Sequence, residues 1–320
     1  MAAGRRSRTA TVLVYRPGAA ESFARLIRAP RDRVSIYTAT RPDEAASLIA
    51  EADVVWAWRL PPMLYAKADR LAWLEAMGAG VDWALVPELP ARVTVTRAAG
   101  VFGPWMAEYT LAWCLSVTQR MAAYREAQHA RHWRDELLPD GLRGKTLVIV
   151  GLGEIGRTIA GMARGLGMRV IGVNRSGRRA PGVSQVYRPS RLTRALPEGD
   201  FVVLVTPLTA ETRGLIGPRQ LGAMKASAWL INVGRGALVD EPALVSALTE
   251  RRIAGAVLDV FTTEPLPPSH SLWALDNVVV TPHVAGPDVP EELATVFNAN
   301  LARYLAGRAL RHVVDRRRGY

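Results

Sequence analysis

Short apolar runs rich in β-branched residues alternate with segments in which apolar residues recur every three or four positions. The short runs predict strands and the periodic segments predict helices. In the first hundred residues the predicted strands are 11–15, 34–38, 53–58, 72–76 and 93–96, with helices at 20–28, 43–50 and 63–68. Strands that are separated by helices of this length pair in parallel through right-handed crossovers. This part of the chain is therefore predicted to be one open α/β unit.

A second α/β series follows a long helical pattern over residues 105–131, which has Pro104 just before it. Its predicted strands are 146–150, 169–173, 201–205, 229–232, 255–259 and 277–280, and a last helix is predicted at 291–305. These strands are almost continuously apolar, as expected where helices cover both faces of a sheet. The pattern predicts two α/β lobes joined by the long helix.

The strand at 146–150 runs directly into a glycine-rich turn, Gly151-Leu-Gly153-Glu154-Ile155-Gly156, and the chain continues as a helix over 157–166. In this strand–turn–helix context the first glycine makes the turn and the second lets the backbone approach a pyrophosphate. The third allows the helix to pack closely on the strand. The helix amino terminus adds amides and positive charge density. A dinucleotide cofactor is predicted at this turn.

The chain is basic, with 41 lysines and arginines against 29 acidic residues and a net charge of +12. Such a charge is typical of nucleic-acid binders, but 49% hydrophobic residues predict a folded protein. Nine arginines and no acidic residue occur between Glu154 and Glu198, just after the predicted cofactor turn. No helix-turn-helix or zinc-finger pattern accompanies the charge, so the expected anionic partner is the cofactor and not a nucleic acid.

The end of the next predicted strand decides between the two nicotinamide cofactors. A carboxylate there would bind the ribose 2′-hydroxyl of NAD, but this chain has Asn174, followed by Arg175, Ser176 and Arg178. Guanidinium groups bind a phosphate through charge-assisted, bidentate hydrogen bonds. We predict NADP(H) as the preferred cofactor, with NAD(H) as the alternative.

Three polar residues follow apolar strands of the second lobe, where open α/β sheets hold their ligands. They are Arg235, Glu264 and His283, each in a short turn. Arginine suits carboxylate binding, and histidine suits proton transfer near neutral pH.

Taken in order, the motifs resemble the D-isomer-specific 2-hydroxyacid dehydrogenase family. They are the glycine turn, Thr206-Pro207-Leu-Thr, Asn232-Val233-Gly234-Arg235-Gly, Leu258-Asp259-Val-Phe-x-x-Glu264-Pro-Leu and Thr281-Pro-His283-x-x-Gly286. The resemblance also covers Met77-Gly-Ala79-Gly80-Val-Asp in the first lobe. It implies two Rossmann- or flavodoxin-like parallel-sheet domains with a cleft between them. A discontinuous substrate-binding domain would comprise residues 1–103 and 288–320, and residues 104–287 would form the dinucleotide-binding domain.

The resemblance implies a role for each polar residue. Arg235 would bind the substrate carboxylate and keto oxygen, and His283 would protonate the developing alkoxide during reduction. Glu264 would orient the His283 ring and help to keep it protonated. The cofactor would contact Thr206, Pro207, Thr212, Val233, Gly234, Asp259 and Gly286, besides the glycine turn and the Asn174 loop. Substrate contacts would come from Ala79, Gly80, Trp56 and Arg59, with Trp58 and Trp105 as further candidates.

These features predict an NADPH-dependent reductase that converts a 2-ketoacid, such as glyoxylate, hydroxypyruvate or a bulkier acid, into a D-2-hydroxyacid. The alternative is a dinucleotide-sensing corepressor with the same fold. Cys114 is the only cysteine, and the apolar run after Arg5, Arg6 and Arg8 is too short for a secretory signal. We therefore expect a cytoplasmic homodimer with no metal, no membrane span and no nucleic-acid partner.

Overall fold

The computed structural model describes residues 9–320. Outside the described residues lie the arginines at positions 5, 6 and 8 and most of the segment considered as a secretory signal. The chain divides into two compact units. Met1–Val101 and Asp288–Tyr320 form the first, and Phe102–Pro287 form the second. Each unit contains one sheet whose strands are all parallel, five-stranded in the first and seven-stranded in the second. The predicted fold class of two parallel-sheet α/β domains is confirmed.

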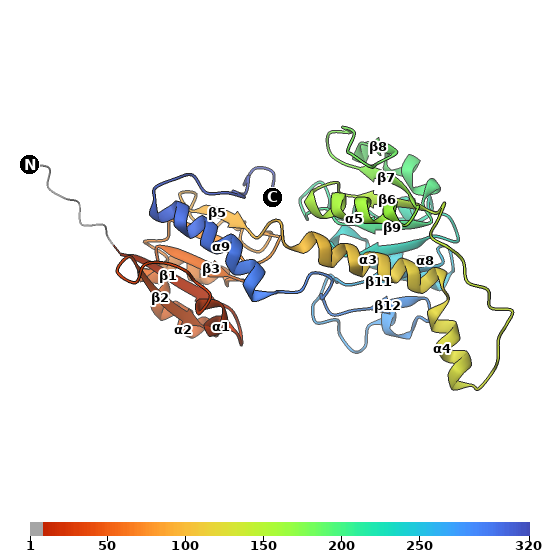
Figure 1. Ribbon diagram of the computed structural model, residues 1–320, viewed down its shortest axis with the longest axis horizontal. Coiled ribbons are helices and arrows are strands. Elements are labelled where there is room, and N and C mark those ends of the chain that lie inside the picture. The colour runs from red at the N-terminus through yellow and green to blue at the C-terminus, as the bar shows by residue number, and fades with distance from the viewer. Residues whose placement is uncertain (1–8) are drawn as a thin grey trace, which may run out of the picture. The chain divides into compact units, whose positions relative to one another are not determined.

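The sheet of the first unit has the strand order β2-β1-β3-β4-β5 (Figure 1). Its strands are β1 (Ala10–Tyr15), β2 (Val34–Ala39), β3 (Val54–Ala57), β4 (Trp73–Ala76) and β5 (Thr94–Arg97). Its helices are α1 (Ala20–Ala24), α2 (Pro42–Leu48) and α9 (Pro290–Leu305), and the predicted helix near residue 63 is the 3₁₀-helix Pro62–Lys67. The chain leaves β1 for β2 on one side and returns to β3 on the other. The switch point of this sheet therefore lies between β1 and β3.

An aromatic stack joins the carboxyl-terminal helix α9 to this sheet. The Phe297 ring on α9 lies between Trp56 on β3 and Trp73 on β4, with ring centres 4.4 and 5.3 Å away. All three side chains are almost completely buried. Stacked aromatic pairs add stability beyond their large buried area. The two ends of the chain are therefore joined in one core, which explains why the first unit is discontinuous.

A buried carboxyl group, Glu75 on β4, lies beside this stack. Its Oε2 accepts hydrogen bonds from the Thr96 hydroxyl at 2.8 Å and from Asn300 Nδ2 on α9 at 2.9 Å. Asn300 in turn holds both backbone groups of Arg311. Burial raises the pKa of Glu75 to about 7, against 4.5 for an ordinary glutamate, although its two hydrogen bonds act in the opposite direction. The folded protein therefore binds this proton more tightly than the unfolded chain does.

We expect Glu75→Gln to remove a pH dependence of stability. With the folded pKa above the unfolded one, the wild-type free energy of unfolding should fall from about pH 4.5 to about pH 7 and then level off. The loss is about 3 kcal/mol at 1.36 kcal/mol per pKa unit. Glutamine keeps an acceptor for Thr96 and Asn300 and cannot ionise. Urea unfolding should show that the free energy of unfolding of the variant, relative to that of the wild type, is higher at pH 8 than at pH 5. The same difference in free energy at both pH values would contradict this account.

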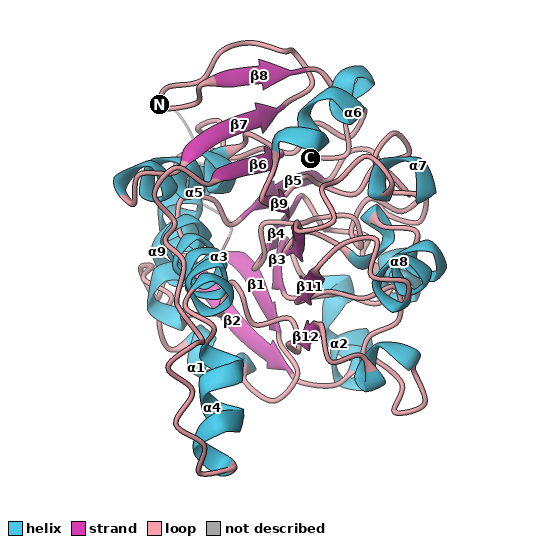
Figure 2. Cartoon of the chain, turned by 90° about the vertical axis from the view of Figure 1, so that its right-hand side faces the viewer, coloured by secondary structure: helices cyan, strands magenta, loops and turns pink. Residues whose placement is uncertain are grey.

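The sheet of the second unit has the order β12-β11-β10-β9-β6-β7-β8, with helices on both faces (Figure 2). Its strands are β6 (Thr146–Val150), β7 (Arg169–Val173), β8 (Gln185–Tyr187), β9 (Phe201–Leu204), β10 (Trp229–Asn232), β11 (Gly255–Leu258) and β12 (Val278–Val280). Its helices are α3 (Phe102–Thr118), α4 (Met121–His129), α5 (Glu154–Gly165), α6 (Leu192–Ala195), α7 (Pro218–Leu221) and α8 (Glu241–Thr249). Its switch point lies between β6 and β9. The central strands are buried on both faces, as predicted.

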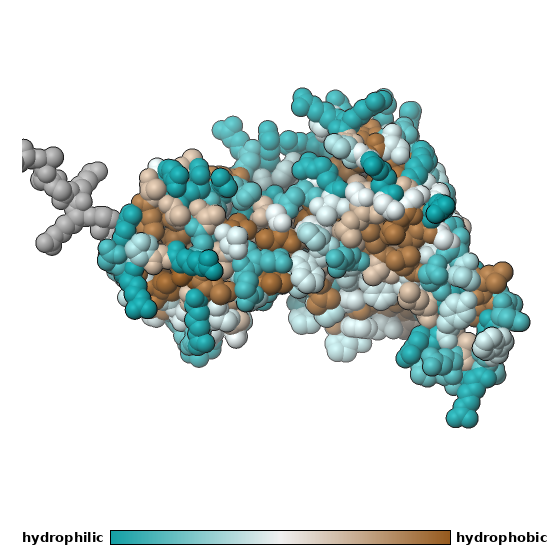
Figure 3. Space-filling model, viewed as in Figure 1, coloured by the Kyte–Doolittle hydropathy of each residue, from teal (hydrophilic) through white to brown (hydrophobic). Residues whose placement is uncertain are grey.

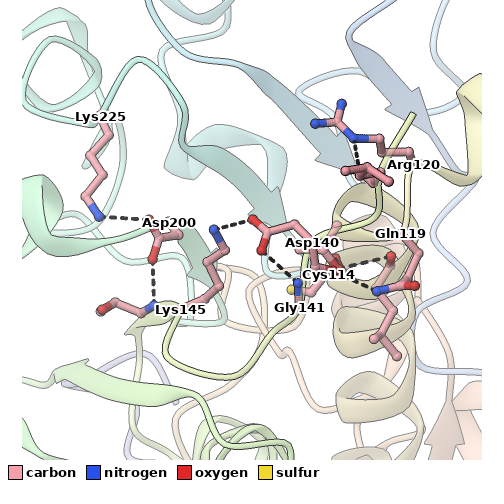
Figure 4. Close-up of polar contacts among 12 residues, drawn as sticks. Cys114, Gln119, Arg120, Asp140, Gly141, Lys145, Asp200 and Lys225 are labelled. Atoms are coloured by element: carbon pink, nitrogen blue, oxygen red, sulfur yellow. Dashed lines mark hydrogen bonds and ion pairs between the residues drawn. The ribbon is translucent and has the colours of Figure 1, made fainter. Parts of the chain in front are cut away.

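The single long helix predicted over 105–131 is wrong, because the structure breaks it into α3 and α4 at Arg120. Arg120 has φ 52°, in the left-handed region that ends a helix. The break is held by polar contacts with the segment that leads back to β6 (Figure 4). Gln119 Nε2 donates to the Asp140 carbonyl and Arg120 Nε to the Leu138 carbonyl, both at 2.7 Å. Helix α4 consequently projects from the body of the second unit (Figure 1).

Among residues 9–320, the longest apolar helices fall short of what a membrane crossing requires.

Candidate active site

The glycine turn after β6 lies at the switch point of the second sheet. Gly151 has φ +113°, and a Cβ there would lie 2.8 Å from Val205 and from Thr206 N at the end of β9. A Cβ on Gly156 would lie 1.9 Å from the Gly151 carbonyl oxygen. Only glycine fits at either position. Gly153 is exposed at the amino terminus of α5, with open space where a Cβ would be. The turn therefore fits a pyrophosphate group, as dinucleotide-binding turns do.

Asn174, the first residue after β7, builds the next loop with its own side chain. Its Oδ1 accepts hydrogen bonds from Gly177 N at 2.6 Å and from the Ser176 hydroxyl at 3.1 Å. Its Nδ2 donates to the Arg178 carbonyl at 3.0 Å. Both ends of the amide are therefore used, which fixes the path of the chain that carries the exposed Arg175 and Arg178.

The structure adds Arg188 to this loop. Arg188 is one of the nine arginines between Glu154 and Glu198, and no motif in the sequence predicts a role for it. The short edge strand β8 was not predicted. The carbonyl of its last residue, Tyr187, accepts a hydrogen bond from Asn174 N. Arg188 follows at once, and its Nε donates to the Ser176 carbonyl at 3.3 Å. Hydrophilic side chains gather over this end of the second unit (Figure 3). An open hollow of about 400 Å³ is lined there by Ser176, Gly177, Val186, Tyr187, Arg188, Ser190 and Arg191.

The turn after β9 forms a wall beside the glycine turn. The Thr212 hydroxyl donates to the Pro207 carbonyl at 2.7 Å and closes the turn. A Cβ on Gly234 would lie 3.2 Å from the Thr206 carbonyl oxygen, so this glycine lets the turn after β10 approach closely. The structure thus brings together Gly151, Thr206 and Gly234, although the residues come from three separate strand ends. Contacts of Glu154, Ile155, Thr206, Pro207, Thr212, Val233 and Gly234 with a cofactor stay predictions.

The turn that carries Arg235 is organised by the buried side chain of Asn232, the last residue of β10. Its Oδ1 accepts from Gly234 N at 3.1 Å, and its Nδ2 donates to the Arg235 carbonyl at 3.0 Å. A Cβ on Gly236 would lie 2.0 Å from Phe261, so the turn packs directly on the loop after β11. Arg235 itself is half-buried, and its side chain donates to the Gly234 carbonyl at 2.8 Å.

His283 and Glu264 come from neighbouring loops after β12 and β11 and meet directly. His283 Nδ1 and Glu264 Oε2 are 3.0 Å apart, with about a quarter of each side chain exposed (27% and 26%). The other carboxylate oxygen of Glu264 accepts a hydrogen bond from Phe261 N at 3.1 Å. The carboxylate is thus fixed from behind and orients the ring, which leaves Nε2 as the atom available for proton transfer.

Asp259 anchors the turn on which His283 sits. Its side chain is buried, and its two oxygens accept hydrogen bonds from Val284 N and Ala285 N, both at 2.9 Å. The Thr281 hydroxyl donates to Asp259 Oδ1 at 2.6 Å. These bonds hold His283 at φ 56°, a left-handed conformation that costs energy in most residues. The structure therefore gives Asp259 a positioning role, and its predicted contact with the cofactor stays a prediction.

The start of helix α3 packs against the same turn. The Tyr109 hydroxyl lies 2.6 Å from the Thr281 hydroxyl, which itself donates to Asp259. Burial raises the pKa of Tyr109 to about 12, so its hydroxyl stays protonated and serves as a donor. A Cβ on Gly286 would lie 3.1 Å from Phe102 on α3, so Gly286 permits this packing.

In the first unit, one predicted substrate contact is wrong. Trp56 is only 1% exposed and is stacked in the core against Phe297, so its side chain cannot reach a ligand. Strand β3 ends at Ala57, and Trp58 is therefore the first residue beyond the sheet edge. A Cβ on Gly78 would lie 3.5 Å from the Trp58 ring, which places the ring beside the turn of Ala79 and Gly80. Arg59 is exposed next to it.

The described residues contain no group of three or more His, Cys, Asp or Glu side chains placed to hold a metal ion. The second unit instead presents an oriented imidazole, a half-buried guanidinium and a glycine turn, all at the carboxyl edge of one sheet. Such a set can bind a dinucleotide, hold a carboxylate and donate a proton.

The chain is similar to known proteins over most of its length. Residues 111–285 match the family model described as D-isomer specific 2-hydroxyacid dehydrogenase, NAD binding domain. The glyoxylate reductase of Aeropyrum pernix is 36% identical over 304 residues, covering 88% of this chain and 90% of its own length. Glyoxylate/hydroxypyruvate reductase A of Serratia proteamaculans is 33% identical over 276 residues, covering 84% and 88%.

A solved structure agrees over nearly the whole chain. The NADPH-dependent glyoxylate/hydroxypyruvate reductase of Sinorhizobium meliloti, in complex with NADP and sulfate, has a TM-score of 0.89 at 30% identity. The match covers 98% of this chain and 100% of that one. The family model spans more than half of the 320 residues, and the relatives cover most of both lobes. The chain therefore belongs to the D-isomer specific 2-hydroxyacid dehydrogenases, a family of oxidoreductases.

Proposed function

We propose that this protein is an NADP(H)-dependent reductase of short 2-ketoacids, of the glyoxylate and hydroxypyruvate type. The observation that carries the proposal is the loop after β7, where Asn174 replaces a carboxylate and fixes a chain segment rich in arginine. The names of the relatives from Aeropyrum pernix and Serratia proteamaculans support the substrate class. The NADP found in the Sinorhizobium meliloti structure supports the cofactor.

Residues 104–287, which make up nearly all of the second unit, are proposed to bind the cofactor, and residues 1–103 with 288–320 are proposed to bind the substrate. Gly151, Gly153 and Gly156 would hold the pyrophosphate. Arg175, Arg178 and Arg188 would hold the 2′-phosphate through charge-assisted hydrogen bonds. The bound nicotinamide would supply the hydride for C2 of the ketoacid.

The protein's own residues would manage the carboxylate and the proton. Backbone amides of Ala79 and Gly80 and the guanidinium of Arg235 would bind the substrate carboxylate, and Arg235 would also polarise the keto oxygen. His283 would donate its Nε2 proton to the alkoxide as charge develops there. Glu264 would accept from Nδ1–H throughout and stabilise the positive ring before transfer.

We expect Asn174→Asp to shift the cofactor preference toward NADH. The substitution is isosteric, and the carboxylate still accepts from Gly177 N and the Ser176 hydroxyl. The oxygen that replaces Nδ2 cannot donate to the Arg178 carbonyl and repels its oxygen, so the change to the loop is confined to this one contact. A negative charge there repels a 2′-phosphate and suits a free ribose hydroxyl. The ratio of kcat/KM for NADPH over NADH should fall at least ~10-fold, the effect of roughly 1.4 kcal/mol.

The same assay tests the function itself, as oxidation of NADPH or NADH with a panel of 2-ketoacids. The KM for glyoxylate should be unaltered in Asn174→Asp, which controls for damage to the substrate site. A wild-type protein that prefers NADH would overturn the cofactor proposal. Tight dinucleotide binding with no turnover of any 2-ketoacid would favour a dinucleotide-sensing protein instead.

We further propose a homodimer in a reducing cytoplasm. Apolar side chains stand exposed on α4 and the segment after it, with Trp133 91% exposed, Leu138 70% and Met121 49%. Large apolar side chains that stand exposed along one segment are typical of interaction sites. Light scattering should give twice the chain mass of 34.9 kDa, and a monomer mass would refute the dimer.

A further inference from the structure

The open hollow next to the edge strand β8 is larger than the proposed 2′-phosphate contact requires. It lies between Ser176 and Gly177, in the loop after β7, and residues 186–188, 190 and 191. We refer to this space as the β8 hollow. Its volume of about 400 Å³ falls in the range of small-molecule sites, roughly 300–1,000 Å³. One phosphate group would therefore fill only part of it.

The β8 hollow is positively charged. Two of its lining residues are arginines, and none is acidic. Glu198 contacts the lining residue Tyr187, whose hydroxyl donates to it at 3.1 Å, but Arg169 already neutralises this carboxylate at 2.7 Å. An anion that enters the hollow therefore meets positive charge that no lining carboxylate offsets.

The first of the two arginines, Arg188, is held in place by the loop after β7. Its Nε donates to the Ser176 carbonyl at 3.3 Å. A Cβ on Gly177 would lie 2.8 Å from Arg188 Cγ, so the arginine stem packs where glycine leaves room. These contacts use one of the five N–H donors of the guanidinium and leave the Nη groups for a ligand.

The second arginine, Arg191, and the hydroxyl of Ser190 supply further donors. Both residues are exposed, and neither side chain forms a hydrogen bond or ion pair with residues 9–320. Guanidinium groups bind phosphate oxygens through charge-assisted, bidentate hydrogen bonds. An anion with two phosphate groups can engage Arg188 and Arg191 together, which a single phosphate does less well.

The β8 hollow adjoins the loop that is proposed to hold the 2′-phosphate of NADPH. Asn174 Oδ1 accepts from Gly177 N at 2.6 Å, so the loop that Asn174 builds is also one wall of the hollow. Arg188 is one of the arginines proposed to hold the 2′-phosphate. An anion bound to Arg188 in the hollow takes donors that NADPH needs, whereas NADH has no 2′-phosphate and needs none of them.

We propose that the β8 hollow binds free phosphate anions, pyrophosphate more tightly than phosphate, in competition with NADPH and not with NADH. The inference rests on the proposed function, because it names a means of regulating that same cofactor site. Pyrophosphate bridges Arg188 and Arg191, and its concentration sets how strongly the protein prefers NADPH.

The kinetic test measures glyoxylate reduction with and without pyrophosphate, with potassium chloride added to keep the ionic strength equal. We expect a dissociation constant of ~1 mM, the affinity that two or three charge-assisted hydrogen bonds provide. About 10 mM pyrophosphate should therefore raise the KM for NADPH ~10-fold and leave the KM for NADH within twofold. Binding at the glycine turn or at Arg235 would instead inhibit with both cofactors.

The binding test is calorimetry of pyrophosphate with the protein in the absence of dinucleotide. Arg191→Met should weaken the binding at least ~10-fold, and Arg191→Lys, which keeps the charge without the planar fork, should recover part of it. Arg194→Met is the matched control, because Arg194 is exposed three positions further on and does not line the hollow. This control should bind pyrophosphate like the wild type.

Equal inhibition with NADPH and NADH, or pyrophosphate binding that Arg191→Met leaves intact, would overturn the inference. NADPH-dependent reduction of glyoxylate in the same assays would leave the proposed function standing. Failure to reduce any 2-ketoacid would instead overturn the proposed function. Pyrophosphate binding that Arg191→Met abolishes and Arg194→Met retains would in that case still support the anion site.

Discussion

Arg235→Ala should lower kcat/KM for the 2-ketoacid by ~10³- to 10⁵-fold. A donor aimed at a developing oxyanion contributes roughly 3–4 kcal/mol, and a hydrogen bond to a charged carboxylate about 1.5–3 kcal/mol. Arg235 is proposed to make both of these contacts. Because its guanidinium is half-buried, water replaces these contacts poorly when the side chain is removed. Steady-state kinetics should show a fall in kcat together with a rise in KM, because the ground state and the transition state both lose a contact.

The turn itself should survive the Arg235→Ala substitution. Asn232 holds the backbone of Gly234 and Arg235, and neither bond uses the arginine side chain. The affinity for NADPH should therefore stay near the wild-type value. Added guanidinium should restore part of the activity, and Arg235→Lys should remain weak because it lacks the planar fork. Wild-type kcat/KM in Arg235→Ala would exclude this residue from the reaction.

Most strands of both sheets could be predicted because they are buried on both faces and read as plain apolar runs. β8 could not, since it is a three-residue edge strand with one exposed and two half-buried residues. The break between α3 and α4 was missed for a different reason. The amino acid there is arginine, and its left-handed backbone is imposed by contacts with residues 138–140, about 20 positions along the chain. The pattern of residues in one sequence does not reveal contacts between positions this far apart.

The same limit applies to the candidate site. The glycine turn and the residues after β10, β11 and β12 were found because each motif is local. Trp56 was wrongly assigned to the substrate site because β3 is a continuous buried run. Such a run has no alternation of apolar and polar residues that would separate core side chains from those at the end of the strand. The predicted strand also extended one residue beyond Ala57. The positioning role of Asp259 depends on amides 25 and 26 residues away. In the sequence Asp259 is recognisable only as part of a motif. The structure shows which backbone amides its carboxylate binds.

The geometry around His283 determines which substitution tests the proton donor. A residue held at φ 56° must tolerate the left-handed region, and asparagine does so better than glutamine or alanine. His283→Asn should therefore keep the turn that Asp259 anchors and remove only the titratable ring. We expect kcat to fall by ~10²- to 10⁴-fold, the range of general acid catalysis. Affinity for NADPH and the melting temperature should change little.

A second histidine–glutamate pair in the same unit supplies the control for His283→Asn. His270 Nε2 lies 3.1 Å from Glu241 Oε1, with side chains 23% and 20% exposed, close to the values of the His283–Glu264 pair. His270 has an ordinary backbone, and its ring accepts from Leu272 N, which an asparagine side chain can also do. His270→Asn should thus retain most of the turnover. Only His283 lies on the turn that Asp259 holds at the sheet edge, so we expect a large fall in kcat for His283→Asn alone. Equal falls in kcat in the two variants would show that the effect of His283→Asn is structural.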